Sequence, residues 1–199
     1  GGVVLADGSL SIETDEQLAA KNITAGGNAV LTPGTDITAN DVTVGGNLNA
    51  KAVNITAQNI SAGGNAALNA ETALTAQNIS AGIDLDAEAV NITAENITAG
   101  NATLKAGAEL SAKNVNVNGD ASITAGTNLA VHDVSVGGDL DAKAKNITVT
   151  SVTGKGNAVL TADKDVTVTG AFSAHNAELT AGENMTLGGK TDVGGTLTT

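Results

Sequence analysis

Large aliphatic residues recur along this chain at three fixed places in a repeat of 18 to 19 residues. Glycines mark the repeat, because they return at Gly26-Gly27, Gly45-Gly46, Gly63-Gly64, Gly82 and Gly100. The residues on either side of each aliphatic position are mostly small or polar, and this alternation with a period of two is typical of β-strands. No stretch has the i, i+3, i+4, i+7 spacing of an amphipathic helix.

Aligning the repeats on their glycines gives three apolar columns. The second column runs from Leu18 through Ile37 to Met185, and the third runs from Ile23 to Val152 and continues with Phe172 and Val193. The first column, shortly after the glycines, is Leu10, Leu31, Leu48, Leu68, Leu85, Leu104, Ile123, Leu140, Leu160, Leu179 and Leu197.

Three short strands in every 18–20 residues, closed by glycine corners, describe one coil of a parallel β-solenoid. We therefore predict an all-β protein in which residues 1–199 form a single β-helical repeat segment. Coils that stack at the strand spacing of ~4.8 Å would make about ten and a half coils into a rod of roughly 50 Å. Because the chain begins inside the pattern, we expect it to be an internal fragment of a longer protein.

The composition fits a thin, repetitive core. The chain has one Phe and no Trp, Tyr or Cys, so Leu, Ile, Val and Ala must supply the area that aromatic residues usually bury. The absence of Cys also excludes disulfides and thiolate metal sites. The net charge of -12 argues against nucleic acid and anionic membrane surfaces as partners. No run of 18 apolar residues occurs, so we expect no membrane insertion.

The tripeptide N-x-S/T, which is the acceptor pattern for N-linked sugar, occurs nine times. Many of its asparagines fall on a column of Asn and Asp residues just before the third apolar column. Asn and Asp tolerate the left-handed backbone conformation of corners, and stacked Asn side chains form amide ladders. We therefore predict a structural ladder of Asn and Asp at a corner, made of Asn22, Asp41, Asn59, Asn78, Asn96, Asn114 and Asp133.

The same column contains residues that cannot carry sugar. Asp41 and Asp133 lack the amide, and Asn114 has no Ser or Thr two residues later. The column thus exists whether or not a sugar acceptor results, and we interpret most of the N-x-S/T tripeptides as a consequence of packing. The candidates for glycosylation are Asn54, Asn91 and Asn101, the last of which lies outside the aligned columns.

Two phrases carry a resemblance to a known family. They are "NITAGGNAVLTPGTDITANDVTVGGNLNA" at 22–50 and "NISAGGNAALNAETALTAQNISAG" at 59–82. Both resemble the haemagglutinin-type repeats of filamentous haemagglutinin and of contact-dependent growth inhibition exoproteins. The resemblance covers essentially the whole chain. It implies a right-handed β-helical shaft that a Gram-negative bacterium secretes through an outer-membrane two-partner transporter to its cell surface.

The sequence favours no enzyme and no cofactor. Arg is absent, and no coil is long enough to build the loops of a catalytic cleft. The densest mixed cluster, Lys143 and Lys145 beside Asp139 and Asp141, is explained by a solvated strand face. His132 and His175 lie in different coils, and catalysis would require a base that a third group orients.

A calcium site is disfavoured by the alignment of the acidic residues. Asp84 and Asp86 have no carboxylate in the equivalent positions of the neighbouring coils, and the alignment places Lys105 above Asp86. We therefore expect charge alternation there and no metal site.

The predicted function is that of a structural shaft in a secreted filamentous adhesin or contact-dependent inhibition exoprotein. Such a shaft projects a distal module that meets a host or bacterial receptor. The alternative is that the rod itself is the adhesive face and binds a carbohydrate or protein receptor. Neither end shows a capping element, so we also expect end-to-end self-association through unpaired strand edges.

Overall fold

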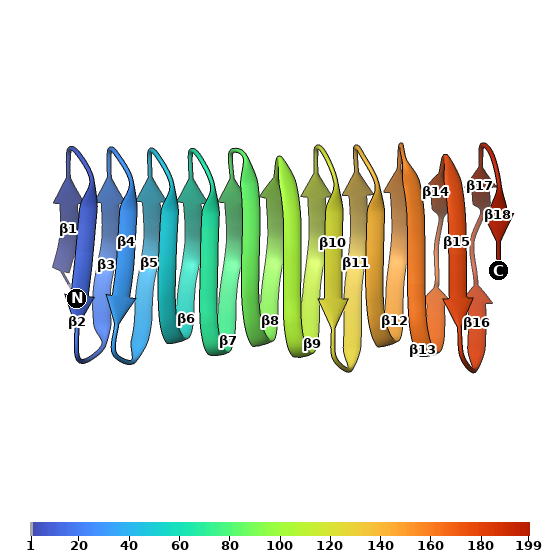
Figure 1. The fold of residues 1–199 in the computed structure, drawn as a ribbon, viewed down its shortest axis with the longest axis horizontal. Coiled ribbons are helices and arrows are strands. Elements are labelled where there is room, and N and C mark those ends of the chain that lie inside the picture. Colours follow the sequence, from blue (N-terminus) through green and yellow to red (C-terminus); the bar gives the residue numbers. More distant parts are fainter. Residues whose placement is uncertain (1) are drawn as a thin grey trace.

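The computed structural model describes residues 2–199 as a right-handed parallel β-solenoid of about 10 turns (Figure 1). All strands belong to one 18-stranded sheet that winds around the axis. Among residues 2–199 there is no helix that could cross a membrane. The strands are β1 (Gly2–Ala6), β2 (Leu10–Thr14), β3 (Leu18–Ala25), β4 (Ala29–Pro33), β5 (Asp36–Val44), β6 (Leu48–Ala62), β7 (Ala66–Ala81), β8 (Asp84–Ala99), β9 (Asn101–Val117), β10 (Ala121–Ala125), β11 (Asn128–Val136), β12 (Leu140–Gly154), β13 (Asn157–Val168), β14 (Phe172–Ala174), β15 (Asn176–Ala181), β16 (Asn184–Leu187), β17 (Thr191–Val193) and β18 (Leu197–Thr198).

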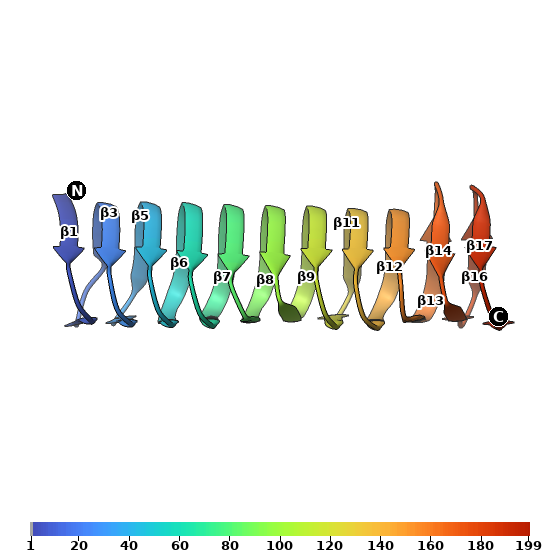
Figure 2. The ribbon, with the colours of Figure 1, turned by 90° about the horizontal axis from the view of Figure 1, so that it is seen from above.

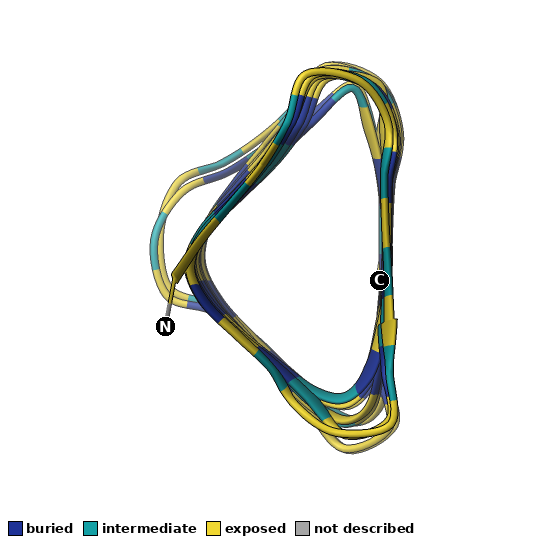
Figure 3. Cartoon of the chain, turned by 90° about the vertical axis from the view of Figure 1, so that its left-hand side faces the viewer, coloured by how far each residue is buried: buried dark blue, intermediate teal, exposed yellow. Residues whose placement is uncertain are grey.

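Each coil has three sides, which the view along the axis shows as a triangle (Figure 3). In the coil that begins at Leu48, the first side is residues 48–52, the second is 54–57 and the third is 59–62. Residues 63–65 close this coil, and we call this turn and its equivalents the glycine corner. Successive coils stack in parallel along a straight axis (Figure 2).

The strands are longer than predicted in the middle of the rod. β6, β7 and β9 contain 15, 16 and 17 residues, because each bends through two corners without leaving the sheet. Between Ala52 and Asn54 the pairing only shifts its register. The backbone hydrogen bonds therefore continue almost around the whole coil, and the glycine corner is the one true turn.

The second and third apolar columns follow the predicted register. Leu18 pairs with Ile37, which pairs with Ile55, and the column continues to Met185. The third column extends from Ile23 to Phe172. The prediction for its last member was wrong, since Val193 pairs with Ala174 and not with Phe172.

The predicted first column is in fact two columns that lie two residues apart. In one, Leu48 stacks between Ala29 and Ala66, and in the other Ala50 stacks between Leu31 and Leu68. Both positions point inward, so an exchange of Leu and Ala between them keeps the same face buried. From the second coil on, each coil contributes one large and one small residue to this side. A large side chain in one coil is thus usually stacked on a small one in the next coil.

The core that results is entirely apolar. No polar or charged residue between positions 2 and 199 is buried, and Leu, Ile, Val and Ala fill the interior with the single Phe172. Burial decreases towards both ends, where Leu10, Ile12 and Met185 are only partly covered. Stability is therefore shared along the array, because each coil is covered by its neighbours.

The glycine corner requires glycine for space and not for backbone conformation. A Cβ on Gly63 would overlap the backbone carbonyl oxygen of Gly45, and one on Gly64 would overlap the side-chain oxygen of Asn47. No residue of the described range 2–199 has a positive φ. The expectation that corner Asn and Asp residues are there for the left-handed conformation was therefore wrong.

Candidate functional site

Three ladders of polar side chains run along the outside of the rod, one at each corner. The first contains the predicted corner residues and lies between the second and third sides. We call it the Asn59 ladder. The backbone register stacks its members in the order Asn22, Asp41, Asn59, Asn78, Asn96, Asn114, Asp133 and Ser151.

The hydrogen bonds of the Asn59 ladder all point the same way. The Asn59 amide donates from Nδ2 to Asp41 Oδ1 at 2.6 Å, and Asn78 donates to Asn59 Oδ1 at 2.7 Å. Asn96 and Asn114 continue the series at 2.7 and 2.6 Å. Asn59, Asn78 and Asn96 thus each donate to the coil before and accept from the coil after. A ladder of this kind holds neighbouring coils in one register.

The two aspartates interrupt the ladder because a carboxylate can only accept. Asp41 accepts from Asn59 but offers no N–H to Asn22, whose Oδ1 is buried without a partner. Asp133 in the same way accepts from Ser151 and has nothing to donate to Asn114. An aspartate therefore marks the N-terminal start of each run of hydrogen bonds.

Replacing Asp41 by asparagine is expected to raise the free energy of unfolding by about 0.5–1.5 kcal/mol. The new Nδ2 would donate to Asn22 Oδ1, and its Oδ1 would still accept from Asn59. Urea denaturation of the purified chain measures the change. Asp163→Asn is the matched control, because it removes the same charge from an exposed side chain that is in no ladder. An equal gain in both variants would show that net charge and not the ladder is responsible.

The second ladder lies between the first and second sides, and we call it the Asn54 ladder. It is less continuous than the Asn59 ladder. Asn54 donates to Asp36 Oδ1 at 2.9 Å, but the next coil has Ala73 at this position. Hydrogen bonds resume beyond it, where Asn146 donates to Asn128 at 3.0 Å and Asn184 to Asp165 at 2.8 Å.

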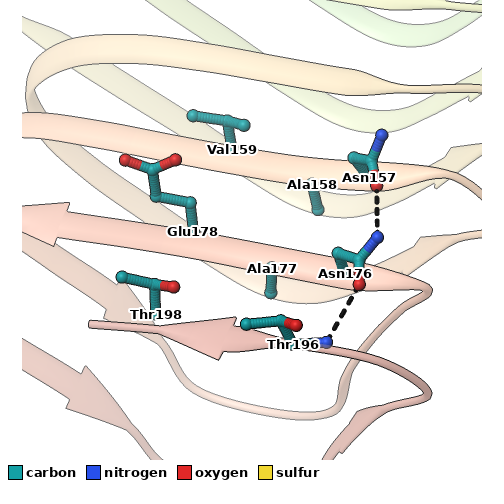
Figure 4. Close-up of a pocket in the computed structure, with 8 residues that line it drawn as sticks. All are labelled: Asn157, Ala158, Val159, Asn176, Ala177, Glu178, Thr196 and Thr198. Carbon is teal, nitrogen blue, oxygen red and sulfur yellow. Dashed lines mark hydrogen bonds between the residues drawn. The ribbon is translucent and has the colours of Figure 1, made fainter.

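A third ladder at the glycine corner was missed by the sequence analysis, and we call it the Asn47 ladder. Its side-chain oxygens mostly accept from a backbone N–H of the following coil, as Asn47 does from Asn65 at 2.9 Å. Figure 4 shows its C-terminal end, where Asn176 donates to Asn157 at 2.8 Å and accepts from the Thr196 N–H at 2.9 Å. The ladder consists of Asn28, Asn47, Asn65, Asp84, Asn101, Asp120, Asp139, Asn157 and Asn176.

Asn101 is therefore a ladder residue, and its predicted place outside the columns was wrong. Its Nδ2 donates to Asp84 Oδ1 at 2.8 Å, and its Oδ1 accepts from the Asp120 N–H at 3.0 Å. The alignment failed here because it was anchored on a first apolar column that alternates between two positions. The signal that could have found the ladder is the Asn or Asp that follows nearly every glycine corner.

The same misalignment affected the charges of the first side. Lys105 lies beside Glu88, with a distance of 2.8 Å between Nζ and Oε1, and not above Asp86, which is flanked by Ala67 and Thr103. This ion pair raises the pKa of Lys105, mainly through the hydrogen bond to Glu88. Both side chains are exposed, so the pair contributes little stability but supports the register.

His132 and Asp133 are in contact on the surface of the rod. His132 Nδ1 lies 2.8 Å from Asp133 Oδ2, and Ser151 donates a hydrogen bond to the other carboxylate oxygen. The pKa of Asp133 is lowered, first by the Ser151 hydrogen bond and then by His132. Asp133 contacts the ring at Nδ1, but no side chain within residues 2–199 is hydrogen-bonded to His132 Nε2.

We expect the hydrogen bond from Ser151 to Asp133 to make the free energy of unfolding depend on pH. A lowered pKa in the folded state stabilises the fold above the ordinary value of 3.8, and the contribution is lost as the pH falls through the folded-state value. Wild type should therefore be more stable than Ser151→Ala at about pH 7, and the difference should shrink in acid. Urea midpoints measured across the acid range test this. A difference that stays constant with pH would contradict the assignment.

No group of three or more His, Asp or Glu side chains within residues 2–199 is arranged to hold a metal ion. Lys143 pairs with Thr124 and Thr161 in the neighbouring coils, so it stands on a solvated strand face. His175 is exposed next to the Asn47 ladder, in a different coil from His132. The lack of catalytic chemistry in this chain stays a prediction.

A column of hydroxyl groups covers the second side of the rod. The register places Thr38, Thr56, Thr75, Thr93, Ser111, Ala130, Thr148, Thr167 and Thr186 in one line, in which Ala130 is the one member without a hydroxyl. Beside it, Gln77, Glu95 and Lys113 form the other wall of a shallow groove of about 350 Å³, whose floor is alanine.

Comparisons with known proteins add no identity to this geometry. No family model, no curated protein and no solved structure matches the chain. The functional argument therefore rests on the rod and its ladders.

Proposed function

We propose that this chain is a structural shaft that holds a distal functional module away from a bacterial surface. The observation that supports this proposal most strongly is the uniform coil. Over about 10 turns the three-sided cross-section is maintained, and every coil is joined to the next by parallel backbone pairing. A rod built in this way has a length set by its number of coils, at ~4.8 Å each.

The surface of the rod supports the same proposal. Within residues 2–199 no polar or charged residue is fully buried and no cluster of side chains is arranged to hold a metal ion, and the recesses of the surface are shallow grooves between rows of side chains. The charge of -12 disfavours lateral association of identical rods. These are properties of a spacer.

The cellular setting follows from the resemblance to haemagglutinin-type repeats. We propose that the parent protein is a secreted adhesin or contact-dependent inhibition exoprotein of a Gram-negative bacterium, exported through an outer-membrane two-partner transporter. A stack in which each coil pairs only with its neighbours suits such export, because each coil that emerges can fold on the previous one.

Removal of whole coils from the parent protein tests the shaft function. Deleting residues 29–157 joins Asn28 to Ala158, and Ala29 and Ala158 occupy the same position in the coil. This deletion removes seven coils, or roughly 34 Å at ~4.8 Å each. The register that defines it is Ala29, Leu48, Ala66, Leu85, Ala102, Ala121, Leu140 and Ala158.

Electron tomography of cells that carry the deletion should show a filament shortened by this amount, with the activity of the distal module retained once cells are in contact. Loss of receptor binding in a folded, surface-displayed deletion variant would contradict the proposal. It would assign recognition to the rod itself.

The ends of the isolated rod provide a partner surface for a second copy. β1 and β18 each leave one strand edge unpaired, and Leu197, which stacks on the buried Ala177, is 43% exposed at the C-terminal end. We propose that purified chains stack end to end through these edges. Light scattering should show a mass that increases with concentration, and a strict monomer at high concentration would contradict this.

The second candidate function is direct adhesion, and the groove on the second side favours it. The hydroxyls of Thr75, Thr93 and Ser111 and the side chains of Gln77 and Lys113 could bind a polar chain along the axis. If this function is correct, the isolated rod binds a glycan or protein from the target surface, and Thr93→Ala weakens the binding. If the shaft function alone is correct, the isolated rod binds neither.

A further inference from the structure

The nine N-x-S/T tripeptides differ in how the folded rod uses their amide nitrogens. Nδ2 is the atom that would bond to a sugar. In seven of the nine, Nδ2 donates a hydrogen bond to the preceding coil at 2.6–3.0 Å. These seven are Asn54, Asn59, Asn78, Asn96, Asn101, Asn146 and Asn184. No Nδ2 hydrogen bond within residues 2–199 is formed by Asn22 or Asn91.

Asn91 lacks this bond because the Asn54 ladder is interrupted below it. Its neighbour in the preceding coil is Ala73, which has no acceptor in its side chain. On the opposite side, Asn91 Oδ1 accepts the Glu109 N–H at 3.3 Å. With Oδ1 engaged by the following coil, Nδ2 of Asn91 has only the methyl group of Ala73 as its column neighbour in the preceding coil.

The rest of the Asn91 tripeptide is also accessible. Asn91 and Thr93 are exposed, while Ile92 between them is 1% exposed and anchors the backbone in the core. The pairing with the next coil shifts its register between Ala89 and Asn91, so the tripeptide begins at a corner. A transferase that reads the asparagine and the hydroxyl two residues later can reach both.

Asn22 differs from Asn91 in its surroundings. Its side chain is half-buried, its Oδ1 is enclosed, and Val3 occupies the position in the preceding coil. Of the three glycosylation candidates from the sequence, Asn54 and Asn101 have Nδ2 bonded to a carboxylate. Among the described residues, Asn91 is thus the one exposed asparagine of an N-x-S/T tripeptide whose Nδ2 donates no hydrogen bond.

We propose that Asn91 is the residue that accepts N-linked sugar in the folded rod. The co-reactants are a glycosyl phosphate donor, such as a nucleotide sugar, and a transferase. Nδ2 attacks C1 of the sugar, the N–C1 bond forms, and the C1–O bond to phosphate breaks with its electron pair leaving on the phosphate. The proton from Nδ2 passes to a base of the transferase. This site is independent of whether the rod acts as a shaft.

The same step is hindered at the ladder residues. At Asn59, for example, the Nδ2 bond to Asp41 holds the amide in place, and the carboxylate occupies the space on that side. Modification there requires this bond to break first. Each ladder asparagine within a continuous run would also lose its contribution to the register.

Glycosylation of the folded chain in solution tests the assignment. The full chain is incubated with UDP-glucose and an N-glycosyltransferase that recognises N-x-S/T, and the sites are mapped by mass spectrometry. Each rate is divided by that of the corresponding free peptide, which corrects for the local sequence. Asn91 should react about tenfold faster than Asn59 or Asn78 on this scale, as expected for the loss of one hydrogen bond. Equal corrected rates, or no reaction at Asn91, would overturn the proposal.

Two variants change the ladder without changing the acceptor tripeptide that is measured. Ala73→Asp supplies an acceptor beneath Asn91, as Asp36 does beneath Asn54, and should slow Asn91 to the rate of the ladder residues. Asn59→Ala removes the acceptor beneath Asn78 and should accelerate Asn78. Circular dichroism confirms that each variant remains folded. Rates that stay unchanged in the folded variants would refute the mechanism.

Discussion

Replacing Gly63 by alanine is expected to destabilise the rod by about 3 kcal/mol, at the upper end of the usual cost of overpacking. The added Cβ would overlap the backbone carbonyl oxygen of Gly45 in the preceding coil. Neither backbone can move aside, because the Gly63 N–H donates to the Val44 carbonyl at 2.8 Å and the Asn47 ladder holds the same corner. Urea denaturation monitored by circular dichroism measures the loss.

Gly107→Ala is the matched control for this substitution. A Cβ on Gly107 would lie 3.5 Å from Val90 Cα and 3.8 Å from the Ala89 carbonyl oxygen, which are ordinary van der Waals contacts, and the φ of Gly107 is not positive. The substitution is therefore expected to be neutral or to stabilise by about 0.4–1 kcal/mol, since alanine restricts the unfolded chain. Equal losses in the two variants would contradict the argument from close approach of the coils.

Leu85→Ala is expected to cost about 4–5 kcal/mol, the upper part of the range for large-to-small core substitutions. Leu85 is 1% exposed, and both of its neighbours in the column, Ala66 and Ala102, are too small to fill the cavity. Leu74 is equally buried but stacks between Ile55 and Ile92, which can close around the space. Leu74→Ala should therefore cost less, about 2–3 kcal/mol.

The comparison of Leu85→Ala with Leu74→Ala tests the two-column packing of the first side. In a single column of leucines, Leu85 would have large neighbours as Leu74 does, and the two losses would be equal. The denaturation midpoints of both variants decide between two alternating columns and a single column of leucines. Val90→Ala is the exposed control and should stay within about 0.5 kcal/mol of wild type. A smaller loss for Leu85→Ala would contradict the packing described above.

The solenoid was predictable because two of its three sides carry one large residue per coil at a constant position. Leu18, Ile37 and Ile55 repeat with the period of the coil, and the structure pairs them as predicted. The first side could not be aligned in this way. An exchange of Leu and Ala over two positions preserves the inward face, so the apolar pattern is the same in either register.

The sequence alignment of the first side was wrong by two residues in some coils, and this error determined which polar contacts could be predicted. The neighbours of Asp84 and Asp86 and the ladder position of Asn101 all depended on it. The Asn59 ladder was accessible from the sequence because it adjoins the regular third column. The direction of its hydrogen bonds could not be predicted from the sequence. Whether an asparagine turns Nδ2 or Oδ1 towards a given neighbour depends on where an aspartate, such as Asp41, replaces an asparagine.

The most direct test of a shaft made of equivalent coils is to stretch one chain between its two ends. The coils are joined only to their neighbours, so force along the axis should unwind them in turn from the ends. Each coil of 17 to 20 residues should lengthen the chain by about 60 Å, from an extended length of 3.3–3.6 Å per residue. A series of steps of this size is the result we predict. A single rupture that releases the whole length at once would contradict a shaft of independently stacked coils.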